Sequence, residues 1–199
     1  MIGNLTNFPG GITSYGVPVI GGGQIPAFLN GKYYFVDGTY GSDSYSGESP
    51  DAAFATIGQA ITVVRARITN WARARWAQND VIVIAPGSYD ENLILGAHGV
   101  TFVGLGHDNR DAQCGVKIKP TTGSPFSVSG LINTAFYNIG FEAVSTSKAF
   151  SALVCNNCLF VNCRFSGPAE TVTCAAAFYT NDATCTKLIN CDFTCAAIA

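Results

Sequence analysis

Isolated acidic side chains in the second half of the chain are the first candidates for chemistry. Cleavage of a glycosidic bond needs two carboxyl groups within several ångströms of each other, one as the acid and one as the base or nucleophile. The carboxylates here are Glu142, Glu170, Asp182 and Asp192, each alone in the sequence. Asp192 lies in fragment 188–193 at the position that Arg164 has in the similar fragment 160–165. A pair of this kind fits a lyase site or a stacked ion pair on a solvated face. We predict no catalytic residues from this pattern, and the existence of an enzymatic activity stays open.

A denser polar cluster, His107-Asp108-Asn109-Arg110, follows an apolar run. A histidine beside an aspartate can act as a base. No nucleophile accompanies it, so an exposed turn is the favoured interpretation. Asp37 and Asp43 lie in a turn-rich loop whose oxygens suit calcium. Their spacing does not match an EF-hand, and hydrogen bonds to the local backbone are therefore the favoured role.

Seven of the eight cysteines fall between Cys155 and Cys195. Cys155 and Cys158 are spaced like half of a zinc site, but Cys191 and Cys195 have a less typical spacing and no histidine nearby. Small inward positions of a repeated fold suit reduced thiols, which behave as compact hydrophobes. We expect no metal and no other cofactor.

Charge and targeting signals limit the classes of partner. The net charge is −2, which gives no basic field for nucleic acid. The start of the chain lacks the charged and apolar segments of a secretory signal, and no apolar run reaches the 18 residues of a membrane span. Only 12% of the residues are charged, whereas 48% are hydrophobic, so we expect a surface that other proteins cover.

Three fragments share one pattern of an apolar pair, asparagine, a small or apolar residue, any residue and phenylalanine: 136–141, 160–165 and 188–193. Their asparagines, Asn138, Asn162 and Asn190, are 24 and then 28 residues apart. Repeats of this length indicate a solenoid, in which each unit buries its apolar face against its neighbours. The units are short and rich in β-forming residues, which favours a β-solenoid over a helical one. Three accidental matches in a β-sandwich are the alternative.

Asparagine has a physical role at such positions. It tolerates the left-handed backbone conformation of a sharp turn better than other residues with a Cβ. Asparagines that stack at one turn in successive coils can also form a ladder of side-chain hydrogen bonds. We predict a structural turn ladder of Asn138, Asn162 and Asn190.

Short apolar runs before the repeats predict further strands at 32–37, 81–85, 93–95, 100–103 and 116–118. Without helices between them, these runs favour a parallel β-helix over a doubly wound sheet. Gly104 takes the place of the later asparagines and is also able to adopt a positive φ. One helix is predicted over about 57–76, because Thr56 and Gln59 form a capping box and apolar residues recur at helical spacing. This helix would cover the open end of the solenoid.

Residues 1–31 differ from the rest because glycine and proline interrupt them repeatedly while many apolar residues remain. We predict an extended arm in 1–31 and a β-helix domain with its capping helix in 32–199. The arm is too apolar for a solvated tail. It packs either on its own domain or on a partner, and the residues that would dock are Phe8, Ile12, Tyr15, Val17, Ile20, Ile25 and Phe28.

Three segments resemble the entry to right-handed, single-stranded parallel β-helix domains of the pectate-lyase-like superfamily: Tyr34–Ser44, Gly47–Ile61 and Val83–Glu91. The resemblance covers about residues 33–195 and implies an all-β fold, although one fold hosts many activities. This arrangement is common in tailspikes and other bacteriophage virion proteins. The leader from Asn7 to Pro18 is similar to the start of phage structural proteins.

The resemblance implies a virion structural protein: a decoration, fibre or spike module that its arm anchors to the particle. Its partners would be other virion proteins of the capsid or tail, with association into a homotrimer. We expect it in the virion, after synthesis in the host cytoplasm without a signal peptide. The alternatives are a tailspike-type depolymerase that cleaves host surface polysaccharide and a carbohydrate-binding β-helix without catalysis. We expect neither nucleic acid nor a membrane as a partner.

Overall fold

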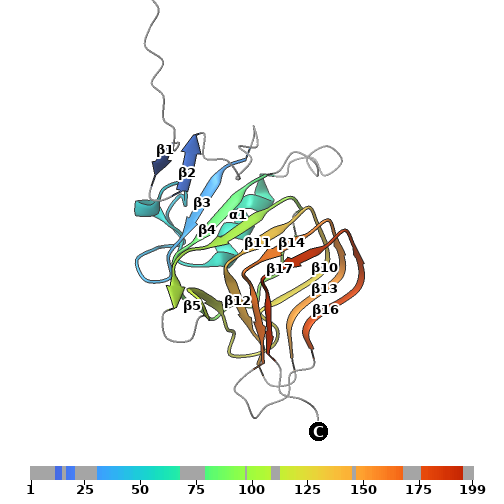
Figure 1. Cartoon of the computed structure of the whole chain (residues 1–199). Coiled ribbons are helices and arrows are strands. Elements are labelled where there is room, and N and C mark those ends of the chain that lie inside the picture. Colours follow the sequence, from blue (N-terminus) through green and yellow to red (C-terminus); the bar gives the residue numbers. More distant parts are fainter. Residues whose placement is uncertain are drawn as a thin grey trace, which may run out of the picture.

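The computed structural model describes residues 12–14, 17–20, 31–67, 79–96, 98–108, 113–144, 147–167 and 176–194. This part of the chain is predominantly β, with one α-helix and three sheets of parallel strands (Figure 1). Two short antiparallel pairs accompany them, β1 (Ile12–Ser14) with β2 (Val17–Ile20) and β7 (His107–Asp108) with β8 (Gln113–Cys114). The predicted all-β class with parallel strands and a single helix is confirmed for the described residues.

The three parallel sheets differ in size. The six-stranded sheet contains β3 (Tyr33–Val36), β4 (Val81–Ile84), β6 (Thr101–Gly104), β11 (Ala135–Tyr137), β14 (Leu159–Val161) and β17 (Lys187–Ile189), in this order. The five-stranded sheet contains β5 (Gly87–Tyr89), β9 (Val116–Ile118), β12 (Ile139–Glu142), β15 (Arg164–Ser166) and β18 (Asp192–Thr194). The three-stranded sheet contains β10 (Phe126–Ile132), β13 (Lys148–Asn156) and β16 (Ala176–Thr184).

From β10 onwards the chain visits the sheets in a fixed rotation. It runs through β10, β11 and β12, one in each sheet, and repeats the cycle with β13 to β15 and β16 to β18. Each new strand pairs in parallel with its counterpart one cycle earlier, so that Phe136 lies beside Phe160 and Phe160 beside Leu188. The spacings of 24 and 28 residues in the sequence are therefore the lengths of successive cycles.

Phenylalanine columns fill the space between the sheets. Phe126 stacks on Phe150 at 4.9 Å between ring centroids, and Phe150 stacks on Phe178 at 5.2 Å. The six-stranded sheet contributes a parallel column in which Phe136 lies 5.0 Å from Phe160. Rings of different columns meet edge to face, as Phe136 and Phe150 do at 82°. In-register pairing places like residues above one another, and offset stacked and T-shaped contacts are the favoured geometries of such rings.

Helix α1 (Ile57–Ala66) begins and ends as its sequence requires. The Thr56 Oγ1 accepts a hydrogen bond from the backbone N–H of Gln59 at 3.1 Å, which confirms the predicted cap. The apolar side chains that recur at helical spacing are buried: Ile57, Ala60, Ile61 and Val64. Arg67 caps the C-terminus. The rest of the predicted helix, residues 68–76, lies outside the described residues.

Glu91 binds the N-terminus of α1 from a distant part of the chain. Its Oε1 accepts the N–H of Ile57 at 2.8 Å, and its Oε2 accepts the N–H of Gly58 at 2.7 Å. These N–H groups have no partner within the helix, and the positive end of the helix dipole favours a carboxylate. Glu91 therefore joins the helix to the strands that follow β5.

Replacing Glu91 by glutamine is expected to lower the free energy of unfolding by about 1–2 kcal/mol, because one amide N–H loses its acceptor. The check is urea unfolding near neutral pH, with Asp51→Asn as a control at an exposed carboxylate in the neighbouring 3-10 helix (Pro50–Ala52). An equal loss in both variants would contradict the role of Glu91.

The titration of Glu91 gives a second readout. Burial raises the pKa of Glu91, although its two backbone hydrogen bonds oppose the shift. The folded protein therefore holds this proton more tightly than the unfolded chain does. The resulting stabilisation is complete below the ordinary pKa of glutamate and is lost as the pH rises through the raised pKa. Unfolding curves measured from below the ordinary pKa of glutamate to above the raised pKa should show this loss of stability in the wild type and not in Glu91→Gln.

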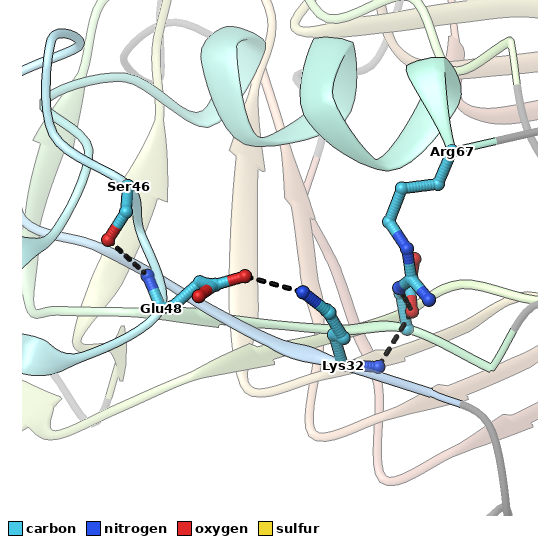
Figure 2. Close-up of polar contacts among 5 residues, drawn as sticks. Lys32, Ser46, Glu48 and Arg67 are labelled. Carbon is cyan, nitrogen blue, oxygen red and sulfur yellow. Dashed lines mark hydrogen bonds and ion pairs between the residues drawn. The ribbon is translucent and has the colours of Figure 1, made fainter.

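Asp80 holds the other end of α1 beside β3. It is fully buried, accepts the backbone N–H of Lys32 at 2.7 Å and forms an ion pair with Arg67. Lys32 in turn reaches Glu48 on the surface at 2.6 Å, as Figure 2 shows. The contacts of Asp80 with Lys32 and with Arg67 join the start of β3 to the end of α1, which are separate in the sequence. They therefore determine how the helix and the sheet meet.

Two features of the fold differ from the expectations. Leu93–Leu95 is not a strand: Leu93 forms a single bridge to Phe126, and Asn92 donates instead to the carbonyls of Thr122 and Ser124. The other difference is the three-stranded sheet, whose long strands were not predicted. Serine and glycine in β10, and serine in β13, interrupt the apolar pattern that identifies a strand. Parallel pairing of β10, β13 and β16 with one another compensates for this.

Candidate functional site

Asn138, Asn162 and Asn190 lie at the same corner of three successive cycles, between the six-stranded and the five-stranded sheet. All three are left-handed, with φ of 57°, 53° and 50°. The Asn190 Nδ2 donates to the Asn162 Oδ1 at 2.7 Å. Asn138 instead donates to the carbonyls of Gly104 and Gly106, at 3.0 and 2.7 Å. The side-chain ladder thus joins two of the asparagines, and the third holds the preceding loop.

A second left-handed corner was missed. Asn133, Asn157 and Cys185 lie between the three-stranded and the six-stranded sheet, with φ of 53°, 51° and 55°. The Asn157 Nδ2 donates to the Asn133 Oδ1 at 2.7 Å. Both corners recur at the same interval, and the asparagines alone could have revealed this one. The third residue of this corner could not be recognised in the sequence, because it is Cys185 and cysteine is not expected at a positive φ.

Asn162 offers a test of the corner. Asn162→Ala is expected to lower the free energy of unfolding by about 1–2 kcal/mol, because alanine keeps a Cβ in the left-handed region. Asn162→Gly adopts the same φ freely and should retain most of the stability. Chemical denaturation of both variants measures the difference, and equal losses would show that the side-chain hydrogen bond, rather than the backbone conformation, matters here.

Gly104 does not take the left-handed conformation predicted for it. It lies in strand β6 and is absent from the residues with positive φ, whereas Gly106 has a φ of 73°. Gly104 is needed for a different reason: a Cβ there would lie 2.3 Å from the carbonyl oxygen of Asn138. The close approach of the Asn138 corner therefore excludes a side chain at this position.

Charged side chains gather on the outer face of the five-stranded sheet. Lys117, Gly140, Arg164 and Asp192 occupy one row across four strands. The Arg164 Nε lies 3.5 Å from the Asp192 Oδ2 and donates no hydrogen bond, so the two interact as a loose ion pair. The prediction that they face each other across adjacent strands is confirmed. The hollow beside Gly140 measures about 10 Å³, enough for a water molecule and not for a sugar.

The carboxylates considered for catalysis are dispersed. Glu142 forms an ion pair with Lys119 at 2.6 Å on the five-stranded sheet, where Asp192 also lies. Asp182 is on β16 of the three-stranded sheet, and Glu170 lies outside the described residues. His107 and Asp108 form β7, while the remainder of that polar cluster is also outside. The described carboxylates on the five-stranded sheet thus have basic neighbours, as in a solvated ion-pair face.

The aspartates considered for calcium accept backbone N–H groups, Asp37 within its own loop and Asp43 from the segment before α1. The Asp37 Oδ1 accepts the N–H groups of Thr39 and Tyr40 at 2.8 and 3.1 Å. The Asp43 Oδ1 accepts the N–H groups of Ala55 and Thr56, both at 2.9 Å. The bonds of Asp37 are the Asx-type contacts that the sequence favoured. Asp43 instead joins the loop to the residues just before α1, a contact with a more distant segment that was not predicted.

The cysteines within the described residues are free thiols, and four are buried: Cys114, Cys155, Cys158 and Cys163. Cys158 and Cys163 each follow a left-handed asparagine and point into the core. A hydrogen bond with Cys191, together with burial, raises the pKa of the Cys163 thiol. Among the described residues, no three potential metal ligands come together. These thiols act as small core side chains.

The outer face of the six-stranded sheet is apolar. Val103, Tyr137, Val161 and Ile189 form one row along it, and Ile189 at its end is 50% exposed. Where the row continues onto β4 and β3, a hollow of about 260 Å³ is lined by residues that include Phe35, Val83 and Pro50 of the 3-10 helix. The sequence contained this signal as outward apolar residues in every strand, but only the register shows that they align.

Little of the predicted docking arm is described. Ile12, Val17 and Ile20 belong to β1 and β2, whose antiparallel pairing was not expected in an extended arm. β-branched residues on both strands favour this pairing despite the glycines around them. The other predicted docking residues, Phe8, Tyr15, Ile25 and Phe28, lie outside the described residues, and their role stays a prediction.

No known protein family matches this sequence, and no curated protein is similar to it. In the part of the chain that the structure describes, no helix is long and apolar enough to cross a membrane.

Proposed function

We propose that this chain is a structural protein of a bacteriophage particle, built as a right-handed, single-stranded parallel β-helix. The fixed rotation of the chain through three sheets supports this fold, because each cycle adds one parallel strand to every sheet. Left-handed residues at two corners of each cycle, asparagine at every one except Cys185, support it further. An N-terminal arm in residues 1–31 anchors the β-helix, which projects as a decoration, fibre or spike module.

The continuous phenylalanine core is the observation that carries this proposal. Phe141, Phe165 and Phe193 form one column on the five-stranded sheet, parallel to the columns of the other two sheets. Columns that run along the stack join each cycle to the next, so bending the stack would break ring contacts along at least one of the sheets. Such an element is suited to a rigid projecting part. Its partners are other virion proteins, and the resemblance to phage β-helices favours a homotrimer.

The test is the location of the protein in intact particles. Phage particles from cells that carry the gene would be purified by density gradient and labelled with gold-conjugated antibodies against this chain. We expect labelling at a fixed place on the particle, on the capsid or the tail, and the intact chain in the protein profile of the gradient fraction. Antibody reactivity only in the cell lysate, with none in the particle fraction, would contradict a virion role.

A second measurement separates the structural role from the depolymerase and the glycan-binding module. The purified protein would be incubated with host capsular polysaccharide and lipopolysaccharide. A structural protein leaves their chain length unchanged and does not sediment with them. Released oligosaccharide would support the depolymerase, and binding without release would support the carbohydrate-binding alternative.

A further inference from the structure

Two cysteines occupy the same position in successive cycles. Cys163 and Cys191 each follow a left-handed asparagine and directly precede Arg164 and Asp192, which pair across β15 and β18. The backbone N–H of Asp192 donates to the Cys163 carbonyl at 2.9 Å. Neighbouring strands lie about 4.8 Å apart, and the Cα atoms of a disulfide are separated by about 4.4–6.8 Å. The two backbones are therefore at a distance that suits a disulfide.

The two thiols also point the same way and are in contact. The Cys163 Sγ lies 3.5 Å from the carbonyl oxygen of Phe136 in the preceding cycle, and the Cys191 Sγ lies 3.6 Å from that of Phe160, again one cycle earlier. A hydrogen bond joins the two thiols. To form a disulfide, the sulfurs must close this contact to about 2.05 Å, the length of an S–S bond. The folded chain thus already brings the two sulfurs together.

The other described cysteines are placed differently. Cys155 and Cys158 share a hydrogen bond as well, but both belong to one cycle and are 0% and 2% exposed, so a dissolved reagent does not reach them. Cys114 is also buried. Cys185 is exposed, but it lies at the other left-handed corner. Contact between two cycles and access from solvent therefore coincide in the pair that spans the last two described cycles.

Cys191 is the thiol that a reagent meets first. It is partly exposed, whereas Cys163 is buried. The hydrogen bond from Cys163 lowers the pKa of the Cys191 thiol, and the thiolate is the form that attacks a disulfide. The last described cycle, β16 to β18, ends all three sheets, and Leu188 and Phe193 are 42% and 49% exposed there. Among the described residues this cycle packs on one side only, so a bond to Cys163 would add to its attachment.

We propose that Cys163 and Cys191 are a site of reversible disulfide formation, which fastens the last described cycle to the one before it in the presence of a small-molecule disulfide such as oxidised glutathione. The Cys191 thiolate attacks one sulfur of the reagent, forms a mixed disulfide and releases one thiol. The Cys163 thiol then gives its proton to water, attacks the Cys191 sulfur and releases the second thiol. The two protein thiols lose two electrons, and the reagent is reduced to two thiols.

The bond would close a long loop. It spans the same 28-residue interval that separates Asn162 from Asn190, and a loop of this length restricts the unfolded chain considerably. In a reducing cytoplasm both residues stay thiols and pack as small core side chains. The inference goes beyond the proposed function and stands on the contact of the two sulfurs. Only the moment of oxidation rests on that function, because a virion leaves the reducing cytoplasm when the host cell lyses.

Disulfide mapping in the full chain tests the proposal. The reduced protein would be incubated under native conditions with oxidised glutathione, its remaining thiols would be blocked with N-ethylmaleimide, and the product would be digested with trypsin without reduction. Cleavage after Lys148, Arg164 and Lys187 separates the peptides 149–164 and 188–199. We expect mass spectrometry to show these two peptides joined by a bond that dithiothreitol breaks.

Variants identify the two sulfurs, because each peptide contains further cysteines. The link should be lost in Cys191→Ala and in Cys163→Ala, and in the second variant Cys191 should remain as a mixed disulfide with glutathione. The link should persist in Cys195→Ala and Cys158→Ala, which remove other cysteines of the same two peptides. Circular dichroism of each variant shows that a lost link does not reflect unfolding.

Oxidation should raise the melting temperature of the wild type by roughly 5–10 °C, because the bond restricts the unfolded chain, and should leave that of Cys191→Ala unchanged. Peptides that stay unlinked in the folded wild type, or a link that persists in Cys191→Ala, would overturn the inference. A linked protein that is absent from phage particles would instead contradict only the virion role.

Discussion

Replacing Phe150 by alanine is expected to lower the free energy of unfolding by about 3–5 kcal/mol, the range for truncation of a buried aromatic side chain. Phe150 is fully buried in β13 at the centre of the core. It stacks between Phe126 and Phe178 and meets the edges of rings from the other two sheets: Phe136, Phe141, Phe160 and Phe165. Alanine would leave a cavity that the in-register strands cannot close.

Equilibrium unfolding in urea, followed by circular dichroism, measures this loss. Leu153→Ala is the control, because Leu153 lies on the same strand and is 45% exposed, so its truncation should change stability little. The slope of the transition with urea should stay the same if unfolding remains cooperative. A Phe150→Ala variant as stable as Leu153→Ala would contradict a core that is continuous between the sheets.

Replacing Asp80 by alanine should cost about 2–4 kcal/mol. The substitution removes the carboxylate that Arg67 and the backbone N–H of Lys32 share, and a charge without its partner is costly in a buried place. The Arg67 side chain is 34% exposed, so water compensates part of the loss and places the expected effect below that of a fully buried pair. Asp80→Asn keeps an acceptor for Lys32 and should lie between the wild type and alanine.

The neighbouring pair of Lys32 and Glu48 provides the control for Asp80. These side chains are exposed, and the hydrogen bond between them therefore adds little to stability. Glu48→Gln should unfold at the same urea concentration as the wild type, while Asp80→Ala unfolds earlier. Proteolysis of α1 under native conditions gives a second readout, because the ion pair holds the end of this helix. Equal resistance of Asp80→Ala and Glu48→Gln would contradict that role.

Glu91 and Asp80 play comparable parts at the two ends of α1. Each is a carboxylate that binds backbone N–H groups of a segment far away in the sequence. The helix contacts β3 and buries one face, but its ends depend on these two side chains. The contact with Ile57 and Gly58 provides a structural reason for an acidic residue at position 91.

Local sequence patterns were sufficient for several parts of the fold. The repeated asparagines predicted a shared corner because few residues with a Cβ tolerate the left-handed region, and Asn138, Asn162 and Asn190 all adopt it. The start of α1 followed from Thr56, whose hydroxyl accepts the backbone N–H of Gln59 within one turn. Apolar runs identified β4 and β9 for the same reason: the information lies within a few consecutive residues.

The sequence by itself thus determined the repeat, the parallel strands, the helix start and the stacked positions of Arg164 and Asp192, because each depends on local conformation or on a constant period. Only the tertiary structure decided the features that depend on register between distant segments. Position 104 lies in a strand and requires glycine because the Asn138 carbonyl approaches it, and Leu93 is no strand because one bridge alone pairs it. The apolar face exists for the same reason: its residues are scattered along the chain, and pairing across six strands brings them together.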